Sequence, residues 1–201
     1  MTGRGFGRRI LEGVATKTRL TLEEFLCLPE TEPPSEYIDG EVIQKVAPNW
    51  FHSILTSRLI EALGPYLRTS GEGVVTNELR HADRSERRVY LPDINVTLMA
   101  NLPASREERR TGPIERRPDF AIEVLSPGDN PGRVLERADF YMRTGVSLLW
   151  FVDPDTETVT VYRPGEAPRT ERAPAVIDAK PVLADFQLPL AELFAALHAG
   201  E

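Results

Sequence analysis

Apolar residues recur at helical spacing in two long stretches of the chain, and each stretch has a recognisable start. Asn49 is a typical N-cap for a helix that runs to about Thr69. Asn130 and a proline at the first helical position start a second helix, which Gly145 ends. Two shorter helices are predicted, residues 21–28 after a Thr21/Glu24 capping box and residues 188–198.

Short segments rich in β-branched and aromatic residues lie between these helices and predict strands. They are a hairpin in 36–46 that turns at Asp39-Gly40, and strands in 73–80, 89–98, 118–125, 147–153 and 157–163, with short strands and turns in 169–188. A helix between the strands at 118 and 147 implies a parallel crossover. We therefore expect an α/β fold with a mixed central sheet flanked by helices and a β-hairpin extension.

The chain of 201 residues is long enough for one domain with a sizeable core. Residues 1–20 have weak periodicity and are predicted to be a flexible N-terminal tail, followed by a single domain over residues 21–201. The single cysteine, Cys27, excludes an intrachain disulfide. No apolar run approaches the roughly 18–20 residues of a membrane span, so we expect a cytoplasmic protein without a membrane segment.

The net charge of −7 argues against a general nucleic-acid binder. Of the 24 basic residues only three are lysines, and the arginines gather in residues 80–88 and 106–117 with acids among them. One reading is two solvated loops. The other is contact with phosphate, for which Arg88, Arg117 and Arg133 are the candidates.

Two predicted strands carry acids at positions where a buried strand would be apolar, namely Asp93 in one and Asp119 and Glu123 in the next. If the strands are antiparallel, setting Asp93 opposite Glu123 makes them coextensive. One face is then an apolar core, and the other is a polar wall lining a cleft. The Cβ atoms of Asp93 and Glu123 would be about 5 Å apart, which lets both carboxylates bind one hard cation.

Other readings of these acids remain open. One carboxyl group is protonated, or both bond to backbone or arginine, or the two form a glycosidase pair, although nothing indicates a sugar platform. His81 is predicted to be an exposed loop residue. Trp50, Phe51 and Trp150 are assigned to packing rather than to base stacking.

Taken together, these segments resemble the PD-(D/E)xK nuclease superfamily with its restriction-endonuclease-like fold. The resemblance is closest to the Uma-two family of restriction endonucleases and covers residues 21–197. Beside His52, the matching segments are EYIDGEVIQ (36–44), LPDINV (91–96), RPDFAIEVLSP (117–127), ADFYMRTGVSLLWFVDP (138–154) and LPLAELF (188–194).

The resemblance implies a DNA endonuclease that uses Mg²⁺ or Mn²⁺, works as a homodimer and hydrolyses phosphodiester bonds. It assigns Asp93 and Glu123 as metal ligands and adds Glu36 and His52 as catalytic residues. The alternative is a catalytically degenerate relative that kept the fold and binds DNA or another protein. A structural homodimer without a nucleic-acid role is a third class.

The superfamily lysine is missing from its usual place, because Leu125 stands two residues after the glutamate. The resemblance moves the cation to Arg137 on the crossover helix, four residues before Tyr141. Tyr141 and Asp119 are expected to support the site. Arginine clamps phosphate but cannot act as a base. Lys45 is the lysine of the core region that could replace it.

Overall fold

The structure is a computed structural model, and it describes residues 19–198 and residue 200. Most of the predicted tail lies outside the described residues. Leu20, at its end, packs against the hairpin: its N–H donates to the Gly40 carbonyl at 3.2 Å and its carbonyl accepts from the Tyr37 hydroxyl at 2.8 Å. Among the described residues no helix combines the length and apolar composition needed to cross a membrane.

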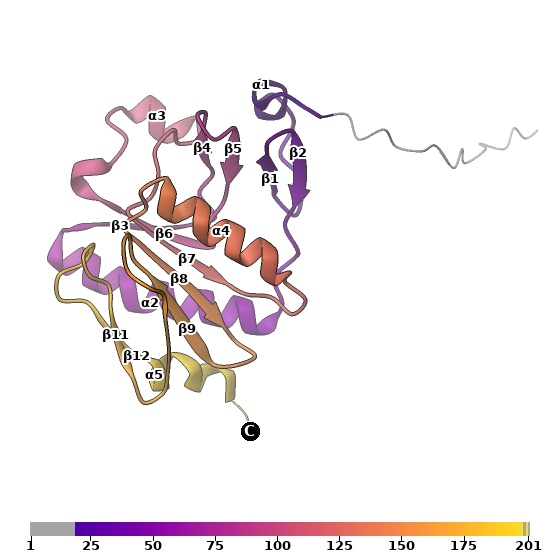
Figure 1. The fold of residues 1–201 in the computed structure, drawn as a ribbon. Helices are drawn as coiled ribbons and strands as arrows, with labels where there is room; N and C mark the ends of the chain where they lie inside the picture. Colours follow the sequence, from indigo (N-terminus) through magenta and orange to yellow (C-terminus); the bar gives the residue numbers. More distant parts are fainter. Residues whose placement is uncertain (1–18, 199, 201) are drawn as a thin grey trace, which may run out of the picture.

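A six-stranded mixed sheet forms the centre of the molecule (Figure 1). In spatial order its strands are β10 (Arg169–Arg172), β9 (Thr158–Tyr162), β8 (Leu148–Asp153), β7 (Phe120–Val124), β6 (Ile94–Leu98) and β3 (Gly73–Asn77). β7 and β8 are parallel and α4 (Pro131–Arg143) joins them, which confirms the predicted crossover. The other neighbouring strands are antiparallel.

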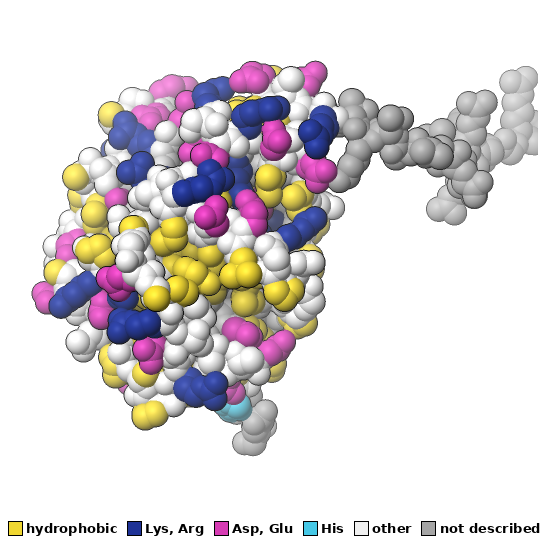
Figure 2. Space-filling model, in the orientation of Figure 1, with side chains coloured by type: hydrophobic (Ala, Val, Ile, Leu, Met, Phe, Trp, Pro, Cys, Tyr) yellow, Lys and Arg dark blue, Asp and Glu magenta, His cyan; other side chains and the backbone are white. Residues whose placement is uncertain are grey.

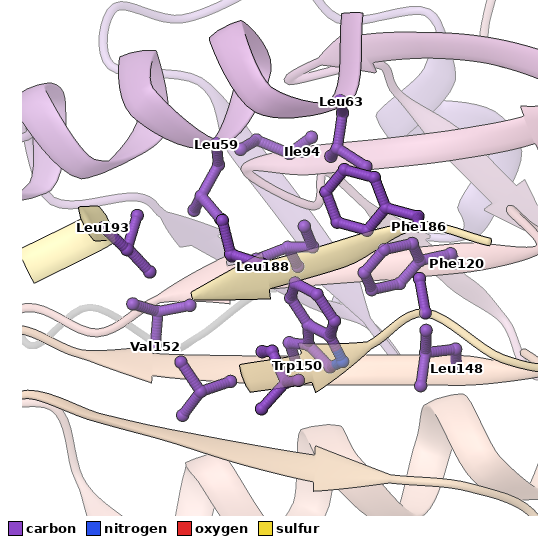
Figure 3. Packing of buried hydrophobic residues seen from close by; sticks show 14 of the residues in the cluster. Leu59, Leu63, Ile94, Phe120, Leu148, Trp150, Val152, Phe186, Leu188 and Leu193 are labelled. Carbon is purple, nitrogen blue, oxygen red and sulfur yellow. The ribbon is translucent and has the colours of Figure 1, made fainter. Parts of the chain in front are cut away.

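Helices cover both faces of this sheet, with α4 in front and α2 (Trp50–Ser70) behind in Figure 1. The core between α2 and the sheet is shown in Figure 3, where Phe120, Trp150 and Phe186 meet leucines of α2. The C-terminal part of the chain closes this side with β11 (Val176–Asp178), β12 (Gln187–Pro189), α5 (Leu190–Ala195) and the 3-10 helix η2 (Ala196–His198). The predicted mixed sheet flanked by helices is therefore confirmed.

A smaller four-stranded sheet contains the predicted hairpin. Its order is β2 (Glu41–Gln44), β1 (Ser35–Ile38), β5 (Arg88–Tyr90) and β4 (His81–Asp83), and α1 (Leu22–Leu26) packs on it. Asp39 and Gly40 both have positive φ, 42° and 95°, as a primed two-residue turn requires. The remaining helices are the 3-10 helix η1 (Met99–Asn101) and α3 (Arg106–Arg110).

β6 and β7 pair in the predicted register, with Ile94 opposite Ile122 and Val96 opposite Phe120. The single strand predicted in 89–98 is wrong, because β5 and β6 belong to different sheets. Pro92 lies between them, and a proline has no N–H to donate to a strand ladder. The residue after it, Asp93, therefore lies at the junction of the two sheets.

Three further side-chain predictions have different outcomes. Trp150 is fully buried, as predicted. His81 is not an exposed loop residue: it lies in β4, is 1% exposed and stacks on Tyr90. Trp50 and Phe51 are 75% and 41% exposed, so the assignment of these two rings to packing is wrong.

Charged side chains of both signs are mixed on the face shown in Figure 2. Most arginines of the two predicted basic runs pair with nearby acids, which favours the solvated-loop reading of these runs. The ion pairs are Arg80–Glu30, Arg84–Glu23, Arg84–Glu115, Arg87–Asp39, Arg88–Glu136 and Arg116–Glu108.

Candidate active site

Side chains from separate elements converge where the two sheets meet. They are Glu36 of β1, Lys45 after β2, His52 of α2, Asp93 before β6, Glu123 of β7, and Arg137 and Tyr141 of α4. Asp93 and Glu123 are only 3% and 2% exposed, so the prediction that they line an open cleft is wrong. The hairpin and α4 bring cations over the polar wall of the sheet and cover it.

Asp93 is surrounded by hydrogen-bond donors. Its Oδ1 accepts from Lys45 Nζ at 2.7 Å, and its Oδ2 lies 3.2 Å from His52 Nε2 and accepts from the Val124 N–H at 2.8 Å. Burial alone would raise the pKa of Asp93, but the hydrogen bond to His52 and the charge of Lys45 hold this pKa well below its usual value. Asp93 is therefore an ionised carboxylate.

Glu123 is bound from α4. The Tyr141 hydroxyl donates to its Oε1 at 2.6 Å, and Arg137 Nη1 donates to its Oε2 at 3.1 Å. Burial raises the pKa of Glu123 to about 7, the charge of Arg137 opposes this rise, and the negative charge of Asp93 adds to it. Glu123 consequently gains or loses a proton near neutral pH.

Arg137 connects Glu123 with Glu36. Its Nη2 lies 3.6 Å from Glu36 Oε2, while Glu36 Oε1 accepts from the Leu91 N–H at 3.1 Å. The charge of Glu123 raises the pKa of Arg137, so the guanidinium remains charged. The spacing of Arg137 and Tyr141 explains why both reach Glu123, since residues four apart share one face of a helix.

Lys45 is the cation that the sequence could not place. Besides Asp93, its Nζ donates to the Leu91 carbonyl at 3.0 Å. Burial lowers the pKa of Lys45, but the negative charges of Asp93 and Glu123 outweigh it and leave the pKa raised. The sequence marks it only as the lone lysine of the core region, and in the structure its side chain points to the opposite side from that of exposed Gln44.

Local backbone structure fixes the positions of His52 and Lys45. Asn49 caps α2 by accepting from the His52 N–H at 2.9 Å, which holds the first turn and its imidazole beside Asp93. The Lys45 N–H donates to the Pro34 carbonyl at 2.9 Å, which continues the β1–β2 pairing by one residue beyond β2. The ladder directs Lys45 towards Asp93.

Several predicted site residues lie elsewhere. Asp119 accepts from the Leu98 N–H at 2.8 Å and Asn101 Nδ2 at 2.7 Å, at the opposite end of β7 from Glu123. It therefore orders the turn after β6. Of the phosphate candidates, Arg117 donates to the Gly145 carbonyl, away from the cluster. Arg88 is buried, pairs with Glu136 and lies over the Phe140 ring, and it lines the same cavity as Glu36 and Arg137.

The third phosphate candidate, Arg133, lies near the cluster. It is exposed on α4 and lines a cavity of about 350 Å³ together with Glu36 and Arg137. The cavity lies between the hairpin and α4, and of the cluster residues it is lined by Glu36 and Arg137. Arg133 and Arg137 are four residues apart on one side of α4, and Glu36 and Glu136 line the same cavity beside them.

The donor set fits a divalent metal held by few protein ligands. Within the described residues, no group of three His, Cys, Asp or Glu side chains is arranged to hold a metal ion. Asp93 and Glu123 supply two carboxylates, and Mg²⁺ binds through one or two carboxylates while keeping several waters. Asp93 Oδ2 is contacted by both His52 and the Val124 N–H, whereas Asp93 Oδ1 and the two Glu123 oxygens have one partner each. Since a carboxylate oxygen has two lone pairs, these three oxygens leave room for a metal.

The raised pKa of Glu123 predicts a pH-dependent stability in the absence of metal. The folded chain holds this proton more tightly than the unfolded chain, so the contribution of Glu123 to the free energy of unfolding falls as pH rises from about 4.5 to about 7. In EDTA, urea unfolding should show wild type losing up to about 3 kcal/mol relative to Glu123→Gln between pH 5 and pH 8.

This difference isolates Glu123. Burial lowers the pKa of His81, which gives the opposite slope, but that slope is common to wild type and variant and cancels. Parallel pH curves for the two proteins would show that Glu123 is ionised throughout this range.

Comparison with known proteins agrees with this fold. Residues 22–191 match the model of the Uma2 (Uma-two) family, which is described as "Putative restriction endonuclease". A crystal structure from Anabaena variabilis ATCC 29413, described as "a putative nuclease belonging to DUF820", is similar with a TM-score of 0.79 and 32% sequence identity, covering 89% of this chain and 99% of that one. Comparison with curated protein sequences gives no match. The family match covers most of the chain and the fold agrees with it, so the chain belongs to the Uma2 family.

Proposed function

We propose that the chain is a metal-dependent deoxyribonuclease that hydrolyses phosphodiester bonds at Asp93 and Glu123. The observation that carries this proposal is the meeting of two carboxylates from adjacent antiparallel strands with two cations, Lys45 and Arg137, in one buried cluster. Family membership supports a nuclease. The identity of the metal, the DNA substrate and the role of each residue are part of the proposal.

Charge balance supports a divalent cation. With Asp93, Glu123 and Glu36 ionised and His52 counted as neutral, three carboxylates face the two cations Lys45 and Arg137, which leaves one negative charge uncompensated. A divalent ion held by Asp93 and Glu123 would turn this into one positive charge, equal and opposite to that of a phosphodiester. When bound, Mg²⁺ or Mn²⁺ polarises a phosphoryl oxygen and lowers the pKa of a bound water.

The side chains of the cluster then have distinct tasks. Arg137, with Arg133 beside it, donates hydrogen bonds to phosphate oxygens. Lys45 remains charged and stabilises negative charge that develops on the phosphoryl group. His52 and Tyr141 hold Asp93 and Glu123 in orientation through the contacts described above, and Glu36 anchors Arg137.

Incubation with supercoiled plasmid tests this function. We expect purified wild type to nick or linearise plasmid with Mg²⁺ or Mn²⁺ and not in EDTA. Glu123→Gln keeps the shape of the side chain but removes its charge, and it should lower the cleavage rate by at least about a hundredfold. Cleavage that persists in Glu123→Gln would exclude this site, because another site or a contaminating nuclease would then account for it.

A second function has one observation in its favour. Both metal-binding candidates are already paired within the protein, Asp93 with Lys45 and Glu123 with Arg137. Such pairing would also stabilise a cluster that binds no metal, in a relative that binds DNA or a protein without cutting. A salt-dependent gel shift without cleavage under any metal would favour this function. Sedimentation of the same sample would test the predicted homodimer.

A further inference from the structure

The first turn of α2 exposes two aromatic rings. Trp50 is 75% exposed and Phe51 41% exposed, whereas Trp150 is fully buried. Val46, in the loop between β2 and α2, is 76% exposed as well. Burying an aromatic side chain stabilises a protein by about 2 kcal/mol or more, so exposed rings at a rigid position are informative.

The same turn belongs to the candidate active site. His52, two residues after Trp50, contacts Asp93, and Lys45 at the other end of the loop contacts Asp93 as well. Because α2 rises about 1.5 Å per residue, the backbones of Trp50 and His52 lie within one helical turn. Residues two apart do not share a helix face, so the Trp50 ring projects to a different side of α2 from the His52 imidazole and flanks the site. The Asn49 cap fixes this turn. Both rings therefore belong to the segment whose Lys45 and His52 side chains contact Asp93.

The charge of the chain bears on how it would bind a nucleic acid. Net charge is −7, and most arginines of the two basic runs are engaged in ion pairs. Attraction to the phosphate backbone is therefore weak, and a nucleic acid needs another source of affinity. Stacking of bases on exposed aromatic rings supplies it and does not depend on positive charge.

Resting on the function proposed above, we propose that Trp50, with Phe51 beside it, is a stacking platform for an unpaired base next to the phosphate bound at Asp93 and Glu123. Bases within a duplex are stacked on each other and unavailable to a side chain. The platform therefore predicts a preference for single-stranded DNA, frayed ends or flaps over an intact duplex of the same sequence.

Binding in EDTA tests the platform without cleavage. The probes are a fluorescently labelled 12-nucleotide oligothymidylate and the same strand annealed to its complement, and fluorescence anisotropy reports affinity. We expect the single strand to bind more tightly than the duplex and to quench the fluorescence of the exposed Trp50. Trp50→Ala should weaken single-strand binding about five- to hundredfold, whereas Trp50→Phe keeps a ring and should stay within about threefold of wild type.

The matched control is Val176→Ala, which removes a 54% exposed apolar side chain from β11, well away from α2's first turn. It should leave both affinities unchanged, and circular dichroism should show that all variants are folded. Single-strand binding that is equal in wild type and Trp50→Ala would overturn the platform while leaving the nuclease proposal intact. Loss of plasmid cleavage in Glu123→Gln remains the separate test of the nuclease. Loss of self-association in Trp50→Ala, with DNA binding unchanged, would instead identify a protein interface and overturn the platform.

Discussion

Replacing Lys45 by methionine should reduce metal-dependent plasmid cleavage by at least about a hundredfold. Lys45 Nζ is 2.7 Å from Asp93 and its raised pKa keeps it charged, so it is placed to stabilise charge that develops at the phosphate. Removal of one such preorganised donor costs about 10²–10³ in rate in well-studied enzymes. Single-turnover cleavage of plasmid at saturating Mg²⁺ measures the effect.

Two other variants serve as a control and a comparison for this experiment. Lys180→Met makes the same chemical change at an exposed position and should cleave like wild type. Arg137→Ala should lose about tenfold, since Arg137 contacts Glu123 and Glu36 rather than Asp93. A loss in Arg137→Ala that is larger than the loss in Lys45→Met would return the role of the missing superfamily lysine to Arg137.

Replacing Asp93 by alanine should lower the free energy of unfolding by about 3–5 kcal/mol, besides abolishing cleavage. The substitution leaves the Lys45 ammonium and the Val124 N–H without their carboxylate in a buried place. Removing one partner of a buried ion pair typically costs this much, because the other charge remains uncompensated. The midpoint of urea unfolding, or a fall in melting temperature of about 10 °C, measures it.

Two further variants test whether the loss of stability in Asp93→Ala comes from the unpaired Lys45 charge rather than from substitution in general. Asp155→Ala removes an exposed carboxylate and should change stability by less than about 0.5 kcal/mol. Asp93→Ala combined with Lys45→Met removes both charges and should be more stable than Asp93→Ala alone. A stability of Asp93→Ala equal to that of wild type would mean that the pair is solvent-screened and that Asp93 lies on an open surface.

Local signals in the sequence predicted much of the framework. The Thr21 capping box, the Asn49 cap and the Asp39-Gly40 turn are all present, because each depends on residues at most a few positions apart. The register of β6 and β7 was also predictable, since a slip by one residue would have turned every apolar side chain of the strand to the wrong face.

The wrong predictions concern residues whose surroundings depend on contacts between segments that are distant in the sequence. Pro92 broke the predicted strand at 89–98 because each half found partners in a different sheet. The predicted solvent-lined cleft is a buried cluster because the hairpin and α4 cover it. Trp50 and His81 exchanged their expected places, the first exposed and the second buried, because a periodic pattern cannot tell which segment will pack over a residue.

The amino-acid sequence by itself determined the mixed α/β fold, the β6–β7 register whose continuation sets Asp93 beside Glu123, and the spacing that turns Arg137 and Tyr141 to one side of α4. These follow from periods of 2 and 3.6 residues along single elements. Only the tertiary structure decided that Lys45, 48 positions before Asp93, is the cation in contact with it. Such a contact joins two elements whose relative position depends on the packing of the whole domain, and no local pattern encodes it.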